Sequence, residues 1–280
     1  MLVVKLGGSA GIDPGPTLDN LAELAKREQV VFIHGANATL DDWTRKLGQT
    51  PRLVQSKSGQ VSRFTDAPTM DLMLAVYAGL VNKRLVEGLQ ARGVNAVGLS
   101  ALDGGIARGP RKDVLRAIED GKPKILRGDF AGSIERIDTG LIELLLGNGY
   151  LPVLTPPALS NTGEAINVDG DKLSLQLAIA LRADALVILS NTAGLLGNLS
   201  DPSSLIRRID VDDDAGVERA MNAARGRMKK KVQAGIDAVR AGIGKVVFAD
   251  AGVDHPIDQA LGGAGTTLTG ARVPAKGSNA

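Results

Sequence analysis

Lysines and glycines that follow short apolar segments are the first residues of this sequence that could do chemistry. VVKLGG is apolar up to Lys5, and Gly7 and Gly8 follow it. Because glycine has no side chain, backbone N–H groups can approach an anion closely at such a turn, and the lysine adds positive charge. A second turn, FIHGANAT at 32–39, precedes a helical pattern whose N-terminus would add further N–H groups. Together the two turns predict a phosphate cradle, although KLGG alone also suits an ordinary turn after a strand.

Charged residues in later segments favour the same chemistry. Asn167, Asp169 and Asp171 alternate just before a helical pattern, where they could organise a charged site or where an aspartate could serve only as an N-cap. GRMKKKVQAG at 226–235 places three lysines at a helix start, which opposes the helix dipole. An anionic ligand would resolve that conflict, and a solvated charged face is the alternative. SNTAGLLGN at 190–198 follows another apolar segment.

Composition excludes several kinds of active site. The sequence has no cysteine and 2 histidines, which excludes disulfides, thiolate chemistry and histidine-rich metal sites. No P-loop, dinucleotide-binding GxGxxG after the first strand, or GxSxG motif is present. The 33 basic and 31 acidic residues nearly balance, and aromatic residues make up 2%, which argues against general nucleic-acid binding. With neither a signal-peptide pattern nor a long apolar span, we expect a cytoplasmic protein without a membrane partner.

An α/β fold must position these residues. Six near-continuous apolar segments predict buried parallel strands, at 2–6, 29–34, 94–100, 150–156, 183–190 and 245–250. Helical patterns lie between them, at 17–28, 69–93, 138–149, 171–183 and 226–242. Gly93, Gly149 and Gly242 stand where helix C-caps belong. We expect two lobes that share one mainly parallel sheet.

Three further segments interrupt or follow this alternation. Residues 50–65 and 113–130 are predicted to form hairpins, which often act as lids or docking surfaces. Residues 108–127 carry seven lysines and arginines against three acids. Residues 270–280 have the composition of a disordered tail.

Seven motifs in order resemble the amino acid kinase family. They are VKLGG, HG after the second strand, SRFTD (62–66), VNKRLVEGL (81–89), INVDGD (166–171), LSNTAGLL (189–196) and GRMKKKV (226–232). The resemblance covers nearly all of residues 1–268. It is strongest to the acetylglutamate kinase branch and, within that branch, to kinases whose aminoadipate substrate is attached to a small carrier protein.

The resemblance implies an αβα sandwich and phosphorylation of a side-chain carboxylate by ATP, with Mg²⁺ carried by the nucleotide. It implies a substrate lobe at 1–165 and an ATP lobe at 166–269. Lys5 and Lys231 would flank the transferred phosphoryl group, with Asp171 organising both lysines. The remaining implied site residues are Gly7 and Gly8 for phosphate, Gly35, Ala36, Arg63 and Asn167 for substrate, and Ser190, Asn191, Leu196 and Gly197 for the nucleotide.

The resemblance also implies partners and shows one departure. A small acidic carrier protein would dock on the basic 108–127 hairpin, unless this is an ordinary solvated hairpin, and the helix at 66–93 would pair in a homodimer. Ala36 and Asn37 stand where the family usually has glycines, and Asn37 could donate a hydrogen bond instead.

Three functions remain open from the sequence. The substrate could be carrier-bound aminoadipate, or glutamate as well. It could instead be free N-acetylglutamate. A non-catalytic amino acid or nucleotide sensor is the alternative of another class; HGAN favours it, and the retained Lys5, Asp171 and Lys231 argue against it.

Overall fold

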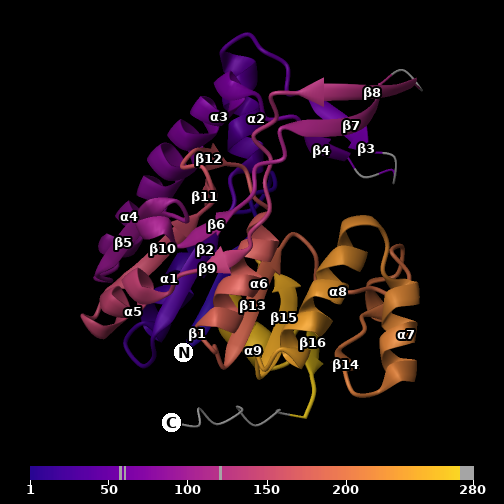
Figure 1. Ribbon diagram of the computed structural model, residues 1–280. Coiled ribbons are helices and arrows are strands. Elements are labelled where there is room, and N and C mark those ends of the chain that lie inside the picture. The colour runs from indigo at the N-terminus through magenta and orange to yellow at the C-terminus, as the bar shows by residue number, and fades with distance from the viewer. Residues whose placement is uncertain (57–58, 60, 120–121, 272–280) are drawn as a thin grey trace, which may run out of the picture.

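A central sheet of eight strands organises the molecule. The computed structural model describes residues 1–56, 59, 61–119 and 122–271 (Figure 1). The strands lie in the order β14 (Arg208–Asp210), β16 (Thr266–Thr269), β15 (Lys245–Asp250), β13 (Ala185–Ser190), β1 (Leu2–Leu6), β2 (Val30–His34), β10 (Leu151–Thr155) and β5 (Ala96–Ser100). All neighbouring pairs are parallel except β15 and β16. The predicted mainly parallel sheet is therefore confirmed.

Helices cover both faces of this sheet and complete an αβα sandwich. One face packs against α1 (Gly15–Leu24), α4 (Asn82–Gln90) and α9 (Pro256–Leu261). The other packs against α5 (Gly140–Gly147), α6 (Gly170–Ala180) and α8 (Gly226–Arg240). The sequence patterns did not predict α7 (Asp214–Ala223) or α9. Gly93, Gly149 and Gly242 have φ values of +76°, +76° and +110° shortly after helices, as predicted for C-terminal caps.

The segment predicted as one helix at 69–93 has three parts. It begins with α3 (Ala67–Met73), continues as the π-helix η1 (Leu74–Val81) and ends with α4. Asp66 caps the start, since its carboxylate accepts a hydrogen bond from the Thr69 N–H at 3.1 Å. Apolar side chains of α3 and η1 pack with Leu40 of α2 (Asn37–Lys46). The π-helical winding, a rare form, could not be anticipated from the apolar pattern.

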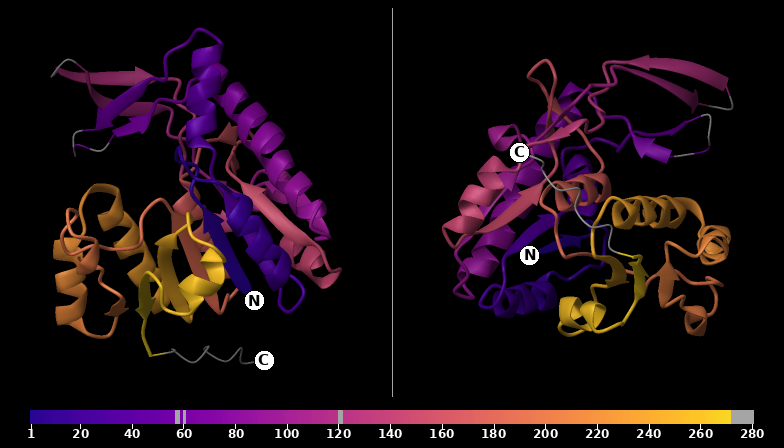
Figure 2. Two further views of the ribbon diagram at one scale, coloured as in Figure 1. Left: turned by 180° about the vertical axis from the view of Figure 1, so that it is seen from behind. Right: turned by 60° about the horizontal axis from the view of Figure 1, so that its bottom comes forward.

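The two predicted hairpins are confirmed and join in one small sheet. Its order is β4 (Val61–Arg63), β3 (Leu53–Ser56), β7 (Val114–Glu119) and β8 (Lys122–Arg127). This sheet extends from the body on the side where α7 and α8 lie (Figures 1 and 2). The hairpin tips at 57–58, 60 and 120–121, and the tail at 272–280, lie outside the described residues. Residues 270 and 271 of the predicted tail are described, and the Ala271 N–H binds the Asp212 carboxylate at 2.5 Å.

Short elements connect these layers. A third sheet has the order β12 (Ala165–Ile166), β11 (Ala158–Ser160), β6 (Ala107–Gly109) and β9 (Arg136–Ile137). The short 3₁₀ helices are η2 (Asp103–Gly105) and η3 (Pro202–Ser204). Strands β1, β2, β10 and β5 form one half of the main sheet, and β13, β15, β16 and β14 form the other. The two halves of the sequence thus contribute adjacent halves of one continuous sheet.

Candidate active site

A lysine–aspartate–lysine cluster lies where β1 meets α6 and α8. The Nζ of Lys5 is 2.5 Å from Oδ1 of Asp171, and the Nζ of Lys231 is 3.4 Å from Oδ2 of the same carboxylate. Burial by itself would raise the pKa of Asp171, but the two lysines outweigh burial and hold that pKa below its ordinary value. The carboxylate therefore stays ionised at neutral pH and holds two cations side by side.

Local sequence explains why the cluster forms. Leu2, Val4 and Leu6 of β1 pack on one face of the sheet, so Lys5 belongs with Val3 on the opposite face, which α6 covers. Asp169 is the N-cap of α6, because its carboxylate accepts hydrogen bonds from the N–H groups of Asp171 and Lys172 at 2.9 and 3.0 Å. This cap places Asp171 in the first turn of α6, opposite Lys5.

Asn167, Asp169 and Asp171 do not act as one group. Asp169 is a cap, as one interpretation of the sequence allowed, and Asp171 binds the lysines. The Asn167 amide instead donates to the Thr65 hydroxyl at 2.9 Å. This bond links Asn167, three residues before the start of α6, to the segment after β4, on the expected substrate side.

The glycine turns after β1 and β2 touch each other. A Cβ added to Gly8 would lie 2.3 Å from the Ala36 nitrogen and 2.8 Å from the Asn37 nitrogen, so no side chain fits there. The Gly8 carbonyl accepts a hydrogen bond from the Ala38 N–H at 2.9 Å. Within the part of the chain that the structure describes, we find no hydrogen bond from the N–H groups of Gly8 or Asn37. The two turns predicted to form the cradle thus adjoin each other.

The neighbouring glycines Gly7 and Gly35 contribute differently. The Gly7 N–H donates to the Leu189 carbonyl at 2.9 Å and the Gly35 N–H donates to the Leu6 carbonyl at 3.0 Å. These bonds tie the turns to the sheet, so neither N–H is available to an anion. Gly35 allows the close approach of the two turns, since a Cβ there would lie 3.0 Å from the Gly8 nitrogen, whereas a Cβ on Gly7 would meet Ile12 at 3.1 Å.

Arg63 is held by a partner that sequence reasoning missed. Its guanidinium forms an ion pair with Asp41 of α2, and its side chain is 10% exposed. Asp41 lies four residues after Asn37, on the same side of α2. That spacing was the available signal, but the sequence could not show that β4 would bring Arg63 to this helix.

The segment around Arg63 is fixed by Asp129. This buried carboxylate accepts hydrogen bonds from the N–H groups of Thr65 and Ala131 at 3.0 and 3.1 Å. Burial raises the pKa of Asp129 above its ordinary value. These hydrogen bonds and the charge of Arg111 lower the pKa, but by less than burial raises it. Thr65 in turn contacts Asn167, so the arginine and the asparagine expected at the substrate are positioned by one network.

His34, which ends β2, has a structural role. Its Nε2 lies 3.1 Å from the Asn82 amide, which also donates to the Val153 carbonyl at 2.9 Å. Burial lowers the pKa of His34 to about 4, so the ring is neutral at pH 7. It therefore fixes the turn after β2 and brings no charge to the cradle.

The residues expected to bind nucleotide follow β13. Ser190 ends that strand beside Gly7, and Asn191 is exposed. Leu196 forms a β-bridge with Leu205, while the Gly197 N–H donates to the Ser204 carbonyl at 2.9 Å. Ser190 and Asn191 therefore lie next to the cradle, and Leu196 and Gly197 lie further along the loop.

The arrangement suits the transfer of a negatively charged group. Two lysines and a backbone cradle stabilise charge on such a group, and phosphoryl transfer requires mainly positioning and charge stabilisation. The chemistry of the two lysines and of the N–H groups of Gly8 and Asn37 suits nucleotide phosphates. Both Asp171 oxygens face lysines, so Mg²⁺ would be held by the phosphates rather than by this carboxylate.

One candidate metal cluster lies elsewhere among the described residues. It comprises Glu23, His255 and Asp258 on the outer face of α1 and α9. The Asp258 carboxylate already accepts hydrogen bonds from Asn20 and Arg27, both at 2.7 Å. The cluster is therefore satisfied by protein groups.

The basic 108–127 segment is only partly available to a partner. Arg111 binds Glu164 at 2.7 Å and Asp113 at 3.2 Å, and its guanidinium lies 3.6 Å from the centre of the Phe130 ring. This arginine stabilises the base of the hairpin and is not a free surface cation. Lys112, Arg116 and Arg127 are exposed. Four apolar side chains of the small sheet are exposed with them: Leu53, Val61, Val114 and Ile125.

Comparison with known proteins gives consistent results. The amino acid kinase family model matches residues 1–250. A "[LysW]-aminoadipate kinase" of Deinococcus radiodurans is 52% identical, covering 96% of this chain and 91% of that protein. The protein of the same name from Thermus thermophilus is 47% identical, covering 96% and 100%. An "Acetylglutamate kinase" of Methanopyrus kandleri is 34% identical, covering 89% and 95%.

A solved structure supports the fold alone. N-acetylglutamate synthase from Neisseria gonorrhoeae matches with a TM-score of 0.75 and 22% identity, covering 96% of this chain and 59% of that one. In the described part of the chain, none of the helices has the length and apolarity needed to cross a bilayer.

Proposed function

The chain belongs to the amino acid kinase family, and from this premise we propose that it phosphorylates carrier-bound aminoadipate. The terminal phosphoryl group of ATP would pass to the side-chain carboxylate and give an acyl phosphate. The observation that carries the proposal is the Lys5–Asp171–Lys231 cluster beside the glycine cradle. An ionised carboxylate needs no general base as a nucleophile, which agrees with the structural role of His34, whose Nε2 faces the Asn82 amide.

Each half of the sheet would bind one reactant. Residues 1–165 would form the substrate lobe, with Arg63 binding the α-carboxylate and Gly35, Ala36 and Asn167 lining the acceptor. Residues 166–269 would form the nucleotide lobe, with Mg²⁺ bound to the ATP phosphates. The reactants would meet where β1 and β13 lie side by side, since this is the junction of the two halves. A biosynthetic kinase that consumes ATP would act in the cytoplasm.

The carrier would dock on the small sheet. Lys112, Arg116 and Arg127 would attract an acidic carrier and steer its approach. The exposed Leu53 and Ile125, at 60% and 62% exposure, would supply apolar contact at the same surface. Arg111 is excluded from this role, because its charge is used within the hairpin.

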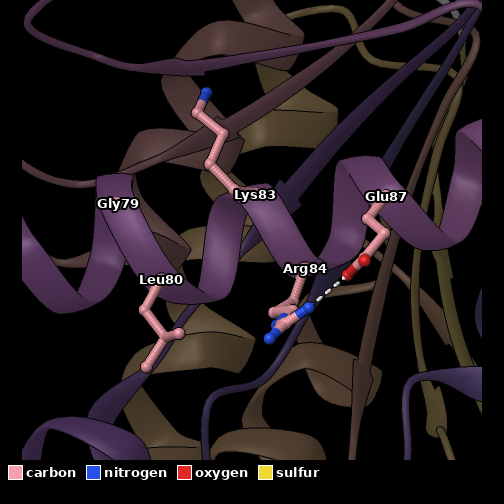
Figure 3. Close-up of a pocket in the computed structure, with 5 residues that line it drawn as sticks. All are labelled: Gly79, Leu80, Lys83, Arg84 and Glu87. Carbon is pink, nitrogen blue, oxygen red and sulfur yellow. Dashed lines mark hydrogen bonds and ion pairs between the residues drawn. The ribbon is translucent and has the colours of Figure 1, made fainter.

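A second copy of the chain would pair through the helix at 67–90. Its outer face has a shallow hollow of about 340 Å³ lined by Gly79, Leu80, Lys83, Arg84 and Glu87 (Figure 3). Arg84 and Glu87 pair with each other at 2.7 Å, and the Lys83 side chain points away from them (Figure 3). Leu80 is left as the apolar group of this face. Leu80→Glu should therefore convert a dimer into a monomer in light scattering.

The test of the reaction is acyl-phosphate formation, trapped as the hydroxamate by hydroxylamine. ATP and Mg²⁺ are supplied with carrier-bound aminoadipate, carrier-bound glutamate or free N-acetylglutamate. Product from the carrier-bound substrates alone supports the proposal. Product from free N-acetylglutamate would instead support the second candidate function, favoured by the Methanopyrus relative. No product from any substrate, with ATP still bound, would contradict both.

A further inference from the structure

A buried tyrosine holds the asparagine at the start of α2. The Tyr77 hydroxyl donates a hydrogen bond to Oδ1 of Asn37 at 2.7 Å. Tyr77 belongs to the π-helix η1 and is 4% exposed, whereas Asn37 is the first residue of α2 and is exposed. The bond joins segments that are 40 residues apart in sequence.

The surroundings of the hydroxyl determine which end of the Asn37 amide faces outward. Burial raises the pKa of Tyr77 to about 12, and a hydrogen bond from the Ala36 backbone opposes this rise only in part. The phenol therefore keeps its proton at neutral pH. The hydroxyl uses this proton in its hydrogen bond to Oδ1 of Asn37. The two hydrogens on Nδ2 of Asn37 then remain to donate elsewhere.

Asn37 stands at the wall of the cradle. The backbone of Asn37 is so close to Gly8 that a Cβ on Gly8 would lie 2.8 Å from the Asn37 nitrogen. The next residue, Ala38, donates its N–H to the Gly8 carbonyl at 2.9 Å. The Asn37 side chain therefore branches from the backbone beside the N–H groups of Gly8 and Asn37, for which the described residues supply no hydrogen-bond acceptor. The Oδ1 atom, which would repel an anion, is turned toward Tyr77.

We propose that Asn37 donates a side-chain hydrogen bond to the phosphoryl group in transfer, and that Tyr77 is the positioning residue that orients it. The inference rests on the proposed kinase reaction and adds a contact to it. Asn37 supplies one more donor where negative charge is concentrated in the transition state. Tyr77 prevents rotation of the amide, which would present oxygen to the phosphoryl group. An aspartate at position 37 could still accept from Tyr77, but it would place a negative oxygen against the phosphoryl group.

Kinetics of four variants test the pair. Asn37→Gly should lower kcat about tenfold, because a hydrogen bond to a charged group is lost. Asn37→Asp should lower kcat about a hundredfold, because the hydrogen bond is replaced by repulsion between two negative groups. Tyr77→Phe should lower kcat about threefold to tenfold, and the KM for the acceptor should stay within about twofold. In the Asn37→Gly background, Tyr77→Phe should have almost no further effect on kcat.

Matched controls lie at the opposite, amino-terminal edge of the sheet. Asn95→Asp and Tyr150→Phe carry the same chemical changes in the hollow beside β5 and β10, and should leave kcat unchanged. Equal losses from Tyr77→Phe in the native and Asn37→Gly backgrounds would overturn the proposal, because Tyr77 would then act only on stability. An Asn37→Asp variant no slower than Asn37→Gly would also overturn it. Since these comparisons of Asn37 variants leave Tyr77 intact, they decide the matter even if Tyr77→Phe does not fold.

A binding measurement separates this inference from the proposed function. Calorimetry with the non-hydrolysable analogue AMP-PNP and Mg²⁺ reports contact with the terminal phosphate without turnover. Asn37→Asp should weaken this binding about tenfold, and Asn95→Asp should not change it. If the native chain phosphorylates none of the acceptors, the proposed reaction fails while the binding comparison still tests Asn37. Unchanged AMP-PNP affinity in Asn37→Asp would count against the contact whatever the reaction.

Discussion

The ammonium group of Lys5 lies 2.5 Å from the carboxylate of Asp171, whose second oxygen faces Lys231 at 3.4 Å. One aspartate at the start of α6 thus keeps two lysines together although like charges repel. A bound phosphoryl group would share these lysines with the carboxylate. Pre-organised charge of this kind is the main contribution that a protein makes to phosphoryl transfer.

Removal of either lysine should slow the reaction and preserve the fold. Lys5→Ala and Lys231→Ala should each lower kcat about tenfold or more, because each removes one positive charge from the phosphoryl site. The hydroxamate assay measures the rate, and circular dichroism checks folding. Lys172→Ala and Lys230→Ala, which remove exposed neighbours, are the controls. Near-normal rates in both test variants would contradict the assignment of the site.

Asp171→Asn should destabilise the free protein and make its stability depend on anions. Two closely spaced lysines would lose their common counter-charge, and breaking such buried pairs costs about 3–5 kcal/mol. The midpoint of urea unfolding should fall, and inorganic phosphate should restore more stability to this variant than to the native chain. Equal effects of phosphate on the two proteins would show that the lysines do not form an anion site.

Arg63→Ala should raise the KM for the acceptor about tenfold or more and leave the KM for ATP within about twofold. The reason is that a guanidinium recognises a carboxylate through paired hydrogen bonds. Asp41→Asn should have a smaller effect of the same kind, because Arg63 would be less firmly oriented. Arg45→Ala is a suitable control, since Arg45 is exposed and pairs with Asp42 on the same helix. A loss confined to the KM for ATP would place Arg63 at the wrong substrate.

His34 should make the protein less stable as the pH falls from about 6.5 to 4. In the folded state its pKa is about 4, against an ordinary value of 6.5, so in this range the unfolded chain binds a proton that the folded chain does not. Stability from this group is therefore fully present above pH 6.5, and its loss by pH 4 amounts to about 3 kcal/mol. Urea unfolding of the native chain and His34→Gln should differ in pH slope across this window. Parallel slopes would show that His34 does not contribute.

Charge reversal on the small sheet should impair use of the carrier-bound substrate. Lys112→Glu, Arg116→Glu and Arg127→Glu together should raise the KM about tenfold and reduce its dependence on salt, because electrostatic steering is lost. The kcat should not change, since none of these residues lies in the cradle. Reversal of Lys26, Arg208 and Arg219, which are exposed elsewhere, makes the same change in net charge. An equal rise in KM in this control would show that net charge, and not the docking surface, is responsible.

The sequence alone determined the layered α/β architecture and indicated the candidate site residues. Near-continuous apolar segments can be buried only as strands covered on both faces, so the parallel sheet followed from periodicity. Glycines and Lys5 directly after strands predicted the cradle, because ligands bind at the carboxyl ends of parallel strands. The order of seven motifs then indicated the family and its residues.

Only the tertiary structure decided how side chains from distant segments pair. Arg63 with Asp41, Tyr77 with Asn37, and Arg111 with Glu164 each join separate elements. The π-helical winding of η1 and the pairing of β3 with β7 were equally absent from the local pattern. Propensity and periodicity report which face of an element is buried, whereas the partner of a polar side chain depends on how elements pack. For that reason the sequence predicted a basic hairpin, and the structure showed that Arg111 is paired within it whereas Lys112, Arg116 and Arg127 are exposed.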